Sequence, residues 1–180
     1  VALGQFIGPA VAPPVAAPSL NQHGLTGSWY EPATSGQGVE LEVYPDLTAP
    51  GTGLAFLSWF TYDSVVGGAD RQRWYVADGP VVTGQPSAAL TIYRNTGGNF
   101  NAPPVTESVA VGTATLSFDS CTSGTLSYRF TDGTGRTGSI PLSRLTQSMT
   151  CSTTGARPTD ADFGFSGNWY DPATSGQGVT

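Results

Sequence analysis

Apolar and polar residues alternate with a period of two along most of the chain. Residues 39–44 place valine and leucine on one face and glutamate on the other, and residues 111–118 and 125–130 repeat the pattern. This period is that of a β-strand with one buried face. Since no segment carries a convincing helical period, the chain is expected to be all-β.

The pattern and the turn residues between its segments predict about eight strands. They are expected at residues 27–31, 39–44, 54–62, 71–77, 88–94, 111–118, 125–130 and 138–145. Segment 54–62 is apolar on both faces, which favours a strand covered on both sides. Pro141 indicates an edge position or a bulge. Short strands with turn signals predict an antiparallel up-and-down barrel or a curved sandwich, and the sequence leaves that choice open.

One stretch of sequence occurs twice. Residues 25–40 (LTGSWYEPATSGQGVE) and 165–180 (FSGNWYDPATSGQGVT) are identical at 11 of 16 positions. The repeat divides the chain into an N-terminal arm with a Pro-rich spacer (1–24), a β-domain (25–151), a linker (152–164) and a second copy of the first-strand motif (165–180). The glycines around Gln37 indicate a positive φ angle or a close approach of two backbones.

The segments GSWYEPATSGQGVELEV, FLSWFTYD, RQRWYVADG, GTATLSF, GTLSYRF and GRTGSIPLSRL resemble a domain that recurs in secreted proteins of Gram-negative bacteria. The resemblance covers about residues 25–151 and centres on the signature WYxPxxSGQG. It implies an extracellular location and a modular domain, and it implies no particular chemistry. Residues 27–30 also resemble the Gly-x-Trp first strand of the avidin and lipocalin barrels, and no ligand-binding residue is inferred from those four positions.

Charge and cysteine content limit the cellular compartments and the classes of binding partner that are expected for this protein. The net charge is −6 and the chain contains no lysine, which disfavours nucleic acid as a partner. No apolar run approaches the roughly 18–20 residues of a membrane span. Cys121 and Cys151 are expected to form a disulfide, which requires an oxidising compartment. The protein is therefore expected to be secreted, either extracellular or on the cell surface.

The sequence contains few residues of the types that form catalytic sites. His23 is the sole histidine, so no catalytic residue, metal ligand or cofactor site is predicted, and the expectation is a protein that is not an enzyme. Arg71, Arg73 and Arg129 could pair with Glu40 and Glu42 across the sheet, and surface ion pairs of this kind contribute little to stability.

The second copy has three interpretations. It is the beginning of another domain, a segment that docks on another subunit by strand addition, or a segment that folds back on its own domain. The main hypothesis is a structural subunit that assembles head-to-tail with other copies of itself into a fibre or surface array. The predicted assembly residues are Phe6, Ile7, Phe165, Trp169, Tyr170, Pro172 and Val179.

The alternative is an extracellular module that binds a glycan or a small ligand, as an accessory domain of a secreted hydrolase or on its own. It would use the tryptophans of the predicted first, third and fourth strands, Trp29, Trp59 and Trp74. Aromatic residues also dominate β-cores, so packing is the competing interpretation of these three.

Overall fold

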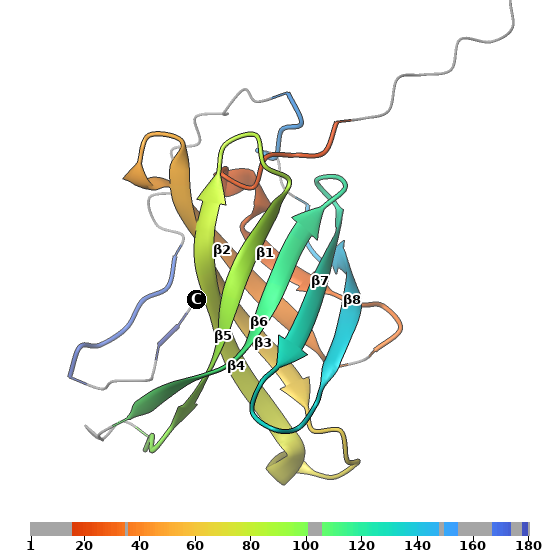
Figure 1. Cartoon of the computed structure of the whole chain (residues 1–180), viewed down its shortest axis with the longest axis vertical. Coiled ribbons are helices and arrows are strands. Elements are labelled where there is room, and N and C mark those ends of the chain that lie inside the picture. The colour runs from red at the N-terminus through yellow and green to blue at the C-terminus, as the bar shows by residue number, and fades with distance from the viewer. Residues whose placement is uncertain are drawn as a thin grey trace, which may run out of the picture.

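The computed structural model describes residues 16–34, 36–100, 106–147, 150–154, 167–173 and 178–179. Eight antiparallel strands follow one another up and down and close into a ring (Figure 1). The strands are β1 (Gly27–Tyr30), β2 (Gly38–Ala49), β3 (Thr52–Tyr62), β4 (Gln72–Val82), β5 (Ser87–Thr96), β6 (Glu107–Phe118), β7 (Ser123–Phe130) and β8 (Thr137–Arg144). Two short 3₁₀ turns, η1 (His23–Leu25) and η2 (Ala69–Arg71), precede β1 and β4.

The ring has few paired positions at three of its joints, one of which is the β1–β2 joint with three pairs. The long β3–β4 pair runs from Thr52↔Val82 to Tyr62↔Gln72, whereas β4 and β5 share three paired positions. The joint that closes the ring, between β1 and β8, has the pairs Trp29↔Arg144 and Tyr30↔Ser143. The ring is therefore closed but is not a regular barrel.

The predicted fold class is confirmed. Each of the eight expected strands is present, and the observed β2, β4 and β6 extend beyond their predicted bounds because the two-residue period stops before the backbone pairing does. Pro141 pairs with β7 at a point where β1 has already left β8, so the missing amide costs no hydrogen bond on that side. The predicted disulfide between Cys121 and Cys151 is also present.

Aromatic side chains fill the ring from the inside. Trp59 lies 5.1 Å from Tyr128 and 6.0 Å from Phe130 between ring centroids, and Tyr75 packs against the same group. Nearer the other end, Trp29 packs on Phe118 at 4.6 Å. These contacts belong to one continuous buried core to which every strand contributes.

Residues 19–25 close one end of the ring, and we call them the plug. Leu20 and Leu25 are fully buried in the core. The Asn21 side chain donates to the Asp46 carboxylate at 2.9 Å and accepts from the Asp46 amide at 3.1 Å. Gln22 bonds in the same reciprocal way to the backbone of Ser152. The described part of the segment that the sequence assigned to a spacer therefore packs with the ring.

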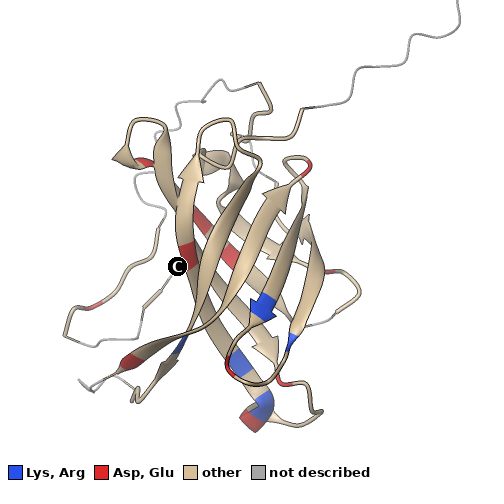
Figure 2. Ribbon diagram, viewed as in Figure 1, with Lys and Arg blue, Asp and Glu red and all other residues tan. Residues whose placement is uncertain are grey.

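Charged residues are sparse on this fold. Figure 2 shows acidic positions spread along the ring and basic positions mostly near the end opposite the plug. Within the described ranges, no helix has the length and apolar character needed to cross a membrane.

Candidate functional site

The outward side of β2, β3 and β4 is unusually apolar for a strand surface. Because side chains alternate across a strand, the residues next to the buried ones point away from the ring. We call this surface the outer face; its residues are Glu42, Tyr44, Leu54, Phe56, Ser58, Phe60, Trp74 and Val76. Phe60 and Trp74 stack with their rings 9° apart and remain about half exposed. The predicted two-sided apolar strand, residues 54–62, thus has one face in the core and one on the outer face.

The second copy of the repeat lies along the outside of the ring (Figure 1). We call its described residues, 167–173 and 178–179, the repeat hairpin. Its Asn168 donates to one carboxylate oxygen of Glu42 twice, from the backbone amide at 3.0 Å and from the side chain at 2.8 Å. The Tyr44 hydroxyl donates to the same oxygen, and burial, followed by this hydrogen bond, raises the pKa of Tyr44. Glu42 is therefore a buried carboxylate, one oxygen of which accepts three hydrogen bonds, on a mostly apolar surface.

The repeat hairpin has the same backbone pairing as the first copy. Trp169 and Val179 exchange two hydrogen bonds of 2.8 Å, at the positions where Trp29 pairs with Val39 in β1 and β2. A Cβ added to Gly38 would lie 2.9 Å from the Trp29 carbonyl oxygen. The same change at Gly178 would place it 2.7 Å from that of Trp169. The motif therefore specifies its own hairpin, and glycine is needed at both positions because the chains approach closely.

A groove of about 850 Å³ separates the repeat hairpin from the outer face. Trp169, Tyr170 and Val179 line it from the hairpin, and Phe60, Trp74 and Val76 line it from the strands. On the hairpin these residues are mostly exposed: 59% of Trp169, 71% of Tyr170 and 70% of Val179 is accessible to solvent. Apolar side chains thus face each other across this groove without being buried.

The predicted site residues fall into separate places. Trp169, Tyr170, Pro172 and Val179 lie on the exposed hairpin, while Phe6, Ile7 and Phe165 lie outside the described residues. The three tryptophans of the ligand hypothesis are not brought together. Trp29 is buried beside the plug and donates to the Leu25 carbonyl at 3.1 Å, Trp59 lies inside the ring, and Trp74 is on the outer face.

The suggested ion pairs between Arg71 or Arg73 and the β2 glutamates are wrong. Both arginines instead bind Asp63, at 3.6 Å and 2.5 Å. Arg73 has the same parity on β4 as the inward-pointing Tyr75, whereas Glu42 points outward on β2, so the sheet lies between them. A hydrogen bond from the Ser64 amide, together with the arginines, lowers the pKa of Asp63.

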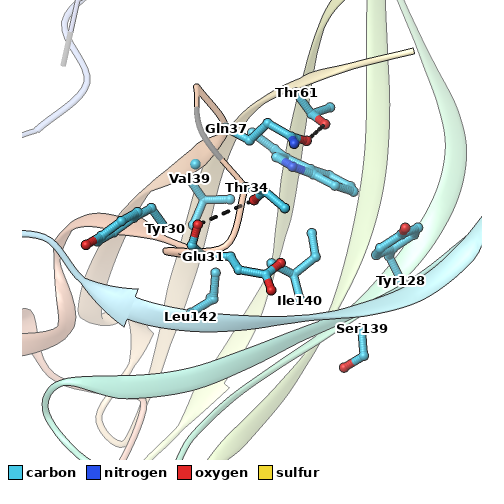
Figure 3. Close-up of a pocket in the computed structure, with 12 residues that line it drawn as sticks. Tyr30, Glu31, Thr34, Gln37, Val39, Thr61, Tyr128, Ser139, Ile140 and Leu142 are labelled. Atoms are coloured by element: carbon cyan, nitrogen blue, oxygen red, sulfur yellow. Dashed lines mark hydrogen bonds between the residues drawn. The ribbon is translucent and has the colours of Figure 1, made fainter. Parts of the chain in front are cut away.

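A second cavity opens where β1 leaves β8, and we call it the seam pocket (Figure 3). Its volume is about 250 Å³. Glu31, Thr34 and Gln37 of the loop after β1 form one wall, β8 forms the other, and β2, β3 and β7 form the floor. The lining residues are Tyr30, Glu31, Thr34, Gln37, Gly38, Val39, Trp59, Thr61, Tyr128, Ser139, Ile140 and Leu142.

Polar groups in the seam pocket come mainly from the signature loop. The Thr61 hydroxyl donates to the side-chain oxygen of Gln37 at 2.6 Å and so fixes the orientation of this lining amide (Figure 3). The Thr34 amide donates to the Glu31 carbonyl at 3.0 Å and closes the turn that carries the Glu31 carboxylate. Gly36 has a φ of 73°, as the sequence predicts for this turn.

Sequence reasoning missed the seam pocket as a site, although it identified its loop as special. Of the three tryptophans of the ligand hypothesis, Trp59 is the one that lines it. The pocket depends on how far β1 stays paired with β8, and the one local signal was Pro141, which indicated an edge position or a bulge.

Within the described residues, no group of three or more His, Cys, Asp or Glu side chains is arranged to hold a metal ion.

No protein-family model matches the chain, and no curated protein or solved structure matches it. The resemblance to the secreted Gram-negative domain therefore stays a prediction.

Proposed function

We propose that this protein is a non-enzymatic structural module that associates head-to-tail with copies of itself. In this proposal the repeat hairpin of one molecule docks on the outer face of the next. The observation that carries the proposal is the hairpin itself, a folded motif with its apolar side uncovered next to an uncovered aromatic strand surface.

The hydrogen bonds between the repeat hairpin and the outer face within one chain support a second copy of the chain as the partner. Asn168 already bonds to Glu42, so the outer face carries a polar anchor that fits the hairpin. The same contact leaves Trp169, Tyr170 and Val179 exposed and the groove unfilled. Exposed apolar patches of this kind mark interaction surfaces. A hairpin from another copy, free of its own tether to the ring, can enter the groove more deeply.

The geometry of such a contact favours an extended assembly. The hairpin and the outer face are different surfaces of the molecule, so each copy would offer one of each. A contact between two unlike surfaces does not close on itself unless the rotation happens to form a ring, and it otherwise produces a filament. The disulfide supports placing this assembly in an oxidising compartment, outside the cell or on its surface.

Electron microscopy and light scattering of the full chain test the proposal. We expect particles that grow with concentration, and we expect Trp169→Ser combined with Tyr170→Ser to yield monomers. Leu145→Ser is the control, because Leu145 is 62% exposed, directly follows β8 and does not line the groove. The proposal fails if the wild-type chain is monomeric at all concentrations, or if the double variant assembles as the wild type does.

A further inference from the structure

We infer that the seam pocket binds one neutral pyranose ring, either a free monosaccharide or the terminal unit of a glycan. This site is separate from the outer face and the repeat hairpin, and it does not depend on the assembly proposed above. No residue of the pocket belongs to the groove.

The size of the pocket limits the ligand. Its volume of about 250 Å³ lies just below the roughly 300–1,000 Å³ of sites for drug-sized ligands. Eight-stranded closed sheets leave room for side chains or for one small ligand. Here the aromatic group around Trp59 fills the deeper part of the ring, so the free space is at the seam. A single six-membered sugar ring fits this limit, and a longer chain would have to extend out of the seam.

The lining matches the two kinds of surface that a sugar presents. Pyranoses carry an apolar face of C–H groups and a rim of hydroxyls. The rings of Trp59 and Tyr128 and the side chain of Ile140 offer an apolar floor and wall. Among the polar lining groups, Glu31 accepts hydrogen bonds, and the amide nitrogen of Gln37, which bonds to no described residue, donates them.

Charge selects against acidic ligands. Among the described residues that line the pocket, Glu31 is the one charged side chain. A carboxylate that takes part in no described ion pair repels phosphates, sulfates and uronic acids, and the net charge of −6 adds to this effect. Neutral sugars meet no such barrier, and a carboxylate is a strong acceptor for their hydroxyls.

Saturation-transfer NMR and isothermal calorimetry with the full chain test the inference. The probes are glucose, galactose, mannose and N-acetylglucosamine, their methyl glycosides, and glucuronic acid. We expect at least one neutral pyranose to bind in the millimolar range or tighter and glucuronic acid not to bind. Binding of the methyl glycoside as well assigns the site to the end of a glycan, whereas binding of the reducing sugar alone assigns it to a free monosaccharide.

Two variants at matched positions of the repeat localise the binding. Glu31→Gln keeps the shape of the side chain and should weaken binding by about tenfold or more, the effect of losing a hydrogen bond to a charged group. Asp171→Asn changes the equivalent position of the repeat hairpin and should leave affinity unchanged. A panel in which no neutral pyranose binds, in which glucuronic acid binds equally well, or in which Glu31→Gln keeps full affinity overturns the inference. Since Glu31→Gln leaves the hairpin intact, its effect is independent of whether the protein assembles.

Discussion

The two copies of the repeat have the same local backbone and opposite surroundings. In the first copy Trp29 is 1% exposed and Val39 is 3% exposed, whereas their counterparts Trp169 and Val179 are mostly exposed. Both copies nevertheless form the same tryptophan–valine pair. The hairpin conformation is therefore a property of the motif, and burial is a property of what lies next to it.

This difference in surroundings shows which copy of the repeat stabilises the folded chain. The first copy is covered by Phe118, by the plug and by Arg144, whose guanidinium lies 5.0 Å from the Trp29 ring centre and donates to the Gly24 carbonyl. Burial lowers the pKa of Arg144, and the carbonyl groups around it accept its hydrogen bonds. The described part of the repeat hairpin touches the ring through hydrogen bonds from Asn168 to Glu42 and Tyr44, and its apolar side chains stay mostly exposed. We therefore expect the hairpin to contribute little to the free energy of unfolding of one chain.

The largest effect should come from truncating the two equivalent tryptophans. Trp29→Ala removes a fully buried side chain and should lower the free energy of unfolding by about 3–5 kcal/mol. Trp169→Ala should change it by less than about 0.5 kcal/mol, as for an exposed site. Urea unfolding of the two variants at a concentration that keeps the chain monomeric measures both values. Equal losses would contradict the contrast between the copies.

Substitution of the paired glycines should separate conformation from stability. Gly38→Ala forces a Cβ against the Trp29 carbonyl inside the ring and should cost about 1–3 kcal/mol. Gly178→Ala forces the same clash in the hairpin, where we expect loss of the Trp169–Val179 bonds with no change in global unfolding. Amide hydrogen exchange at Val179 and urea unfolding read the two effects separately. Protection at Val179 that survives Gly178→Ala would show that the close approach does not matter.

Glu42→Gln should weaken the anchor of the hairpin. The variant replaces hydrogen bonds to a charged acceptor by bonds to a neutral one, which we expect to cost about 1 kcal/mol locally. The Asn168 amide should then exchange several times faster, while the ring amides keep their protection. Glu40→Gln, on the same strand face but not bonded to Asn168, is the matched control. Equal acceleration in both variants would remove Glu42 from this role.

Acid should weaken the ring at the turn between β7 and β8, where Asp132 lies. Partial burial raises the pKa of Asp132, but hydrogen bonds from Thr134 and Arg136 outweigh it, so the pKa lies below its ordinary value of 3.8. A lowered folded-state pKa means that the stabilisation is complete above 3.8 and is lost as the pH falls through the lowered value. We expect Asp132→Asn to remove about 0.2–1 kcal/mol at neutral pH and less at pH 2, the range of a surface ion pair. Urea unfolding measures this loss. A loss of unfolding free energy on Asp132→Asn that stays constant from pH 7 to 2 would contradict the role of the Asp132 carboxylate.

The strands were predictable because their signal is local. Alternation in residues 39–44 or 111–118 depends on neighbours in the chain, and each predicted strand is present. Ring closure was not predictable, since the pairing of Trp29 with Arg144 joins distant parts of the sequence. The separation of the tryptophans follows from register: Trp59 pairs with Tyr75, which puts the adjacent Trp74 on the opposite face. Without that register, three tryptophans on neighbouring strands suggested one cluster.

The burial of Glu42 could not be predicted from the sequence either. The period of two placed Glu40 and Glu42 correctly on the polar side of the strand, and solvent was the natural expectation there. The observed burial depends on Asn168, which the chain brings back from far beyond the ring. That return contact is also the basis for the proposed assembly.

Mixing two disabled variants tests the central claim most directly. One chain carries Trp169→Ser and Tyr170→Ser on the hairpin, and the other carries Phe60→Ser and Trp74→Ser on the outer face. Head-to-tail docking predicts that each variant alone sediments as a monomer, and that the mixture forms a one-to-one heterodimer in which the intact hairpin of one binds the intact face of the other. A mixture that remains monomeric while the wild-type chain assembles would contradict docking of the hairpin on the outer face.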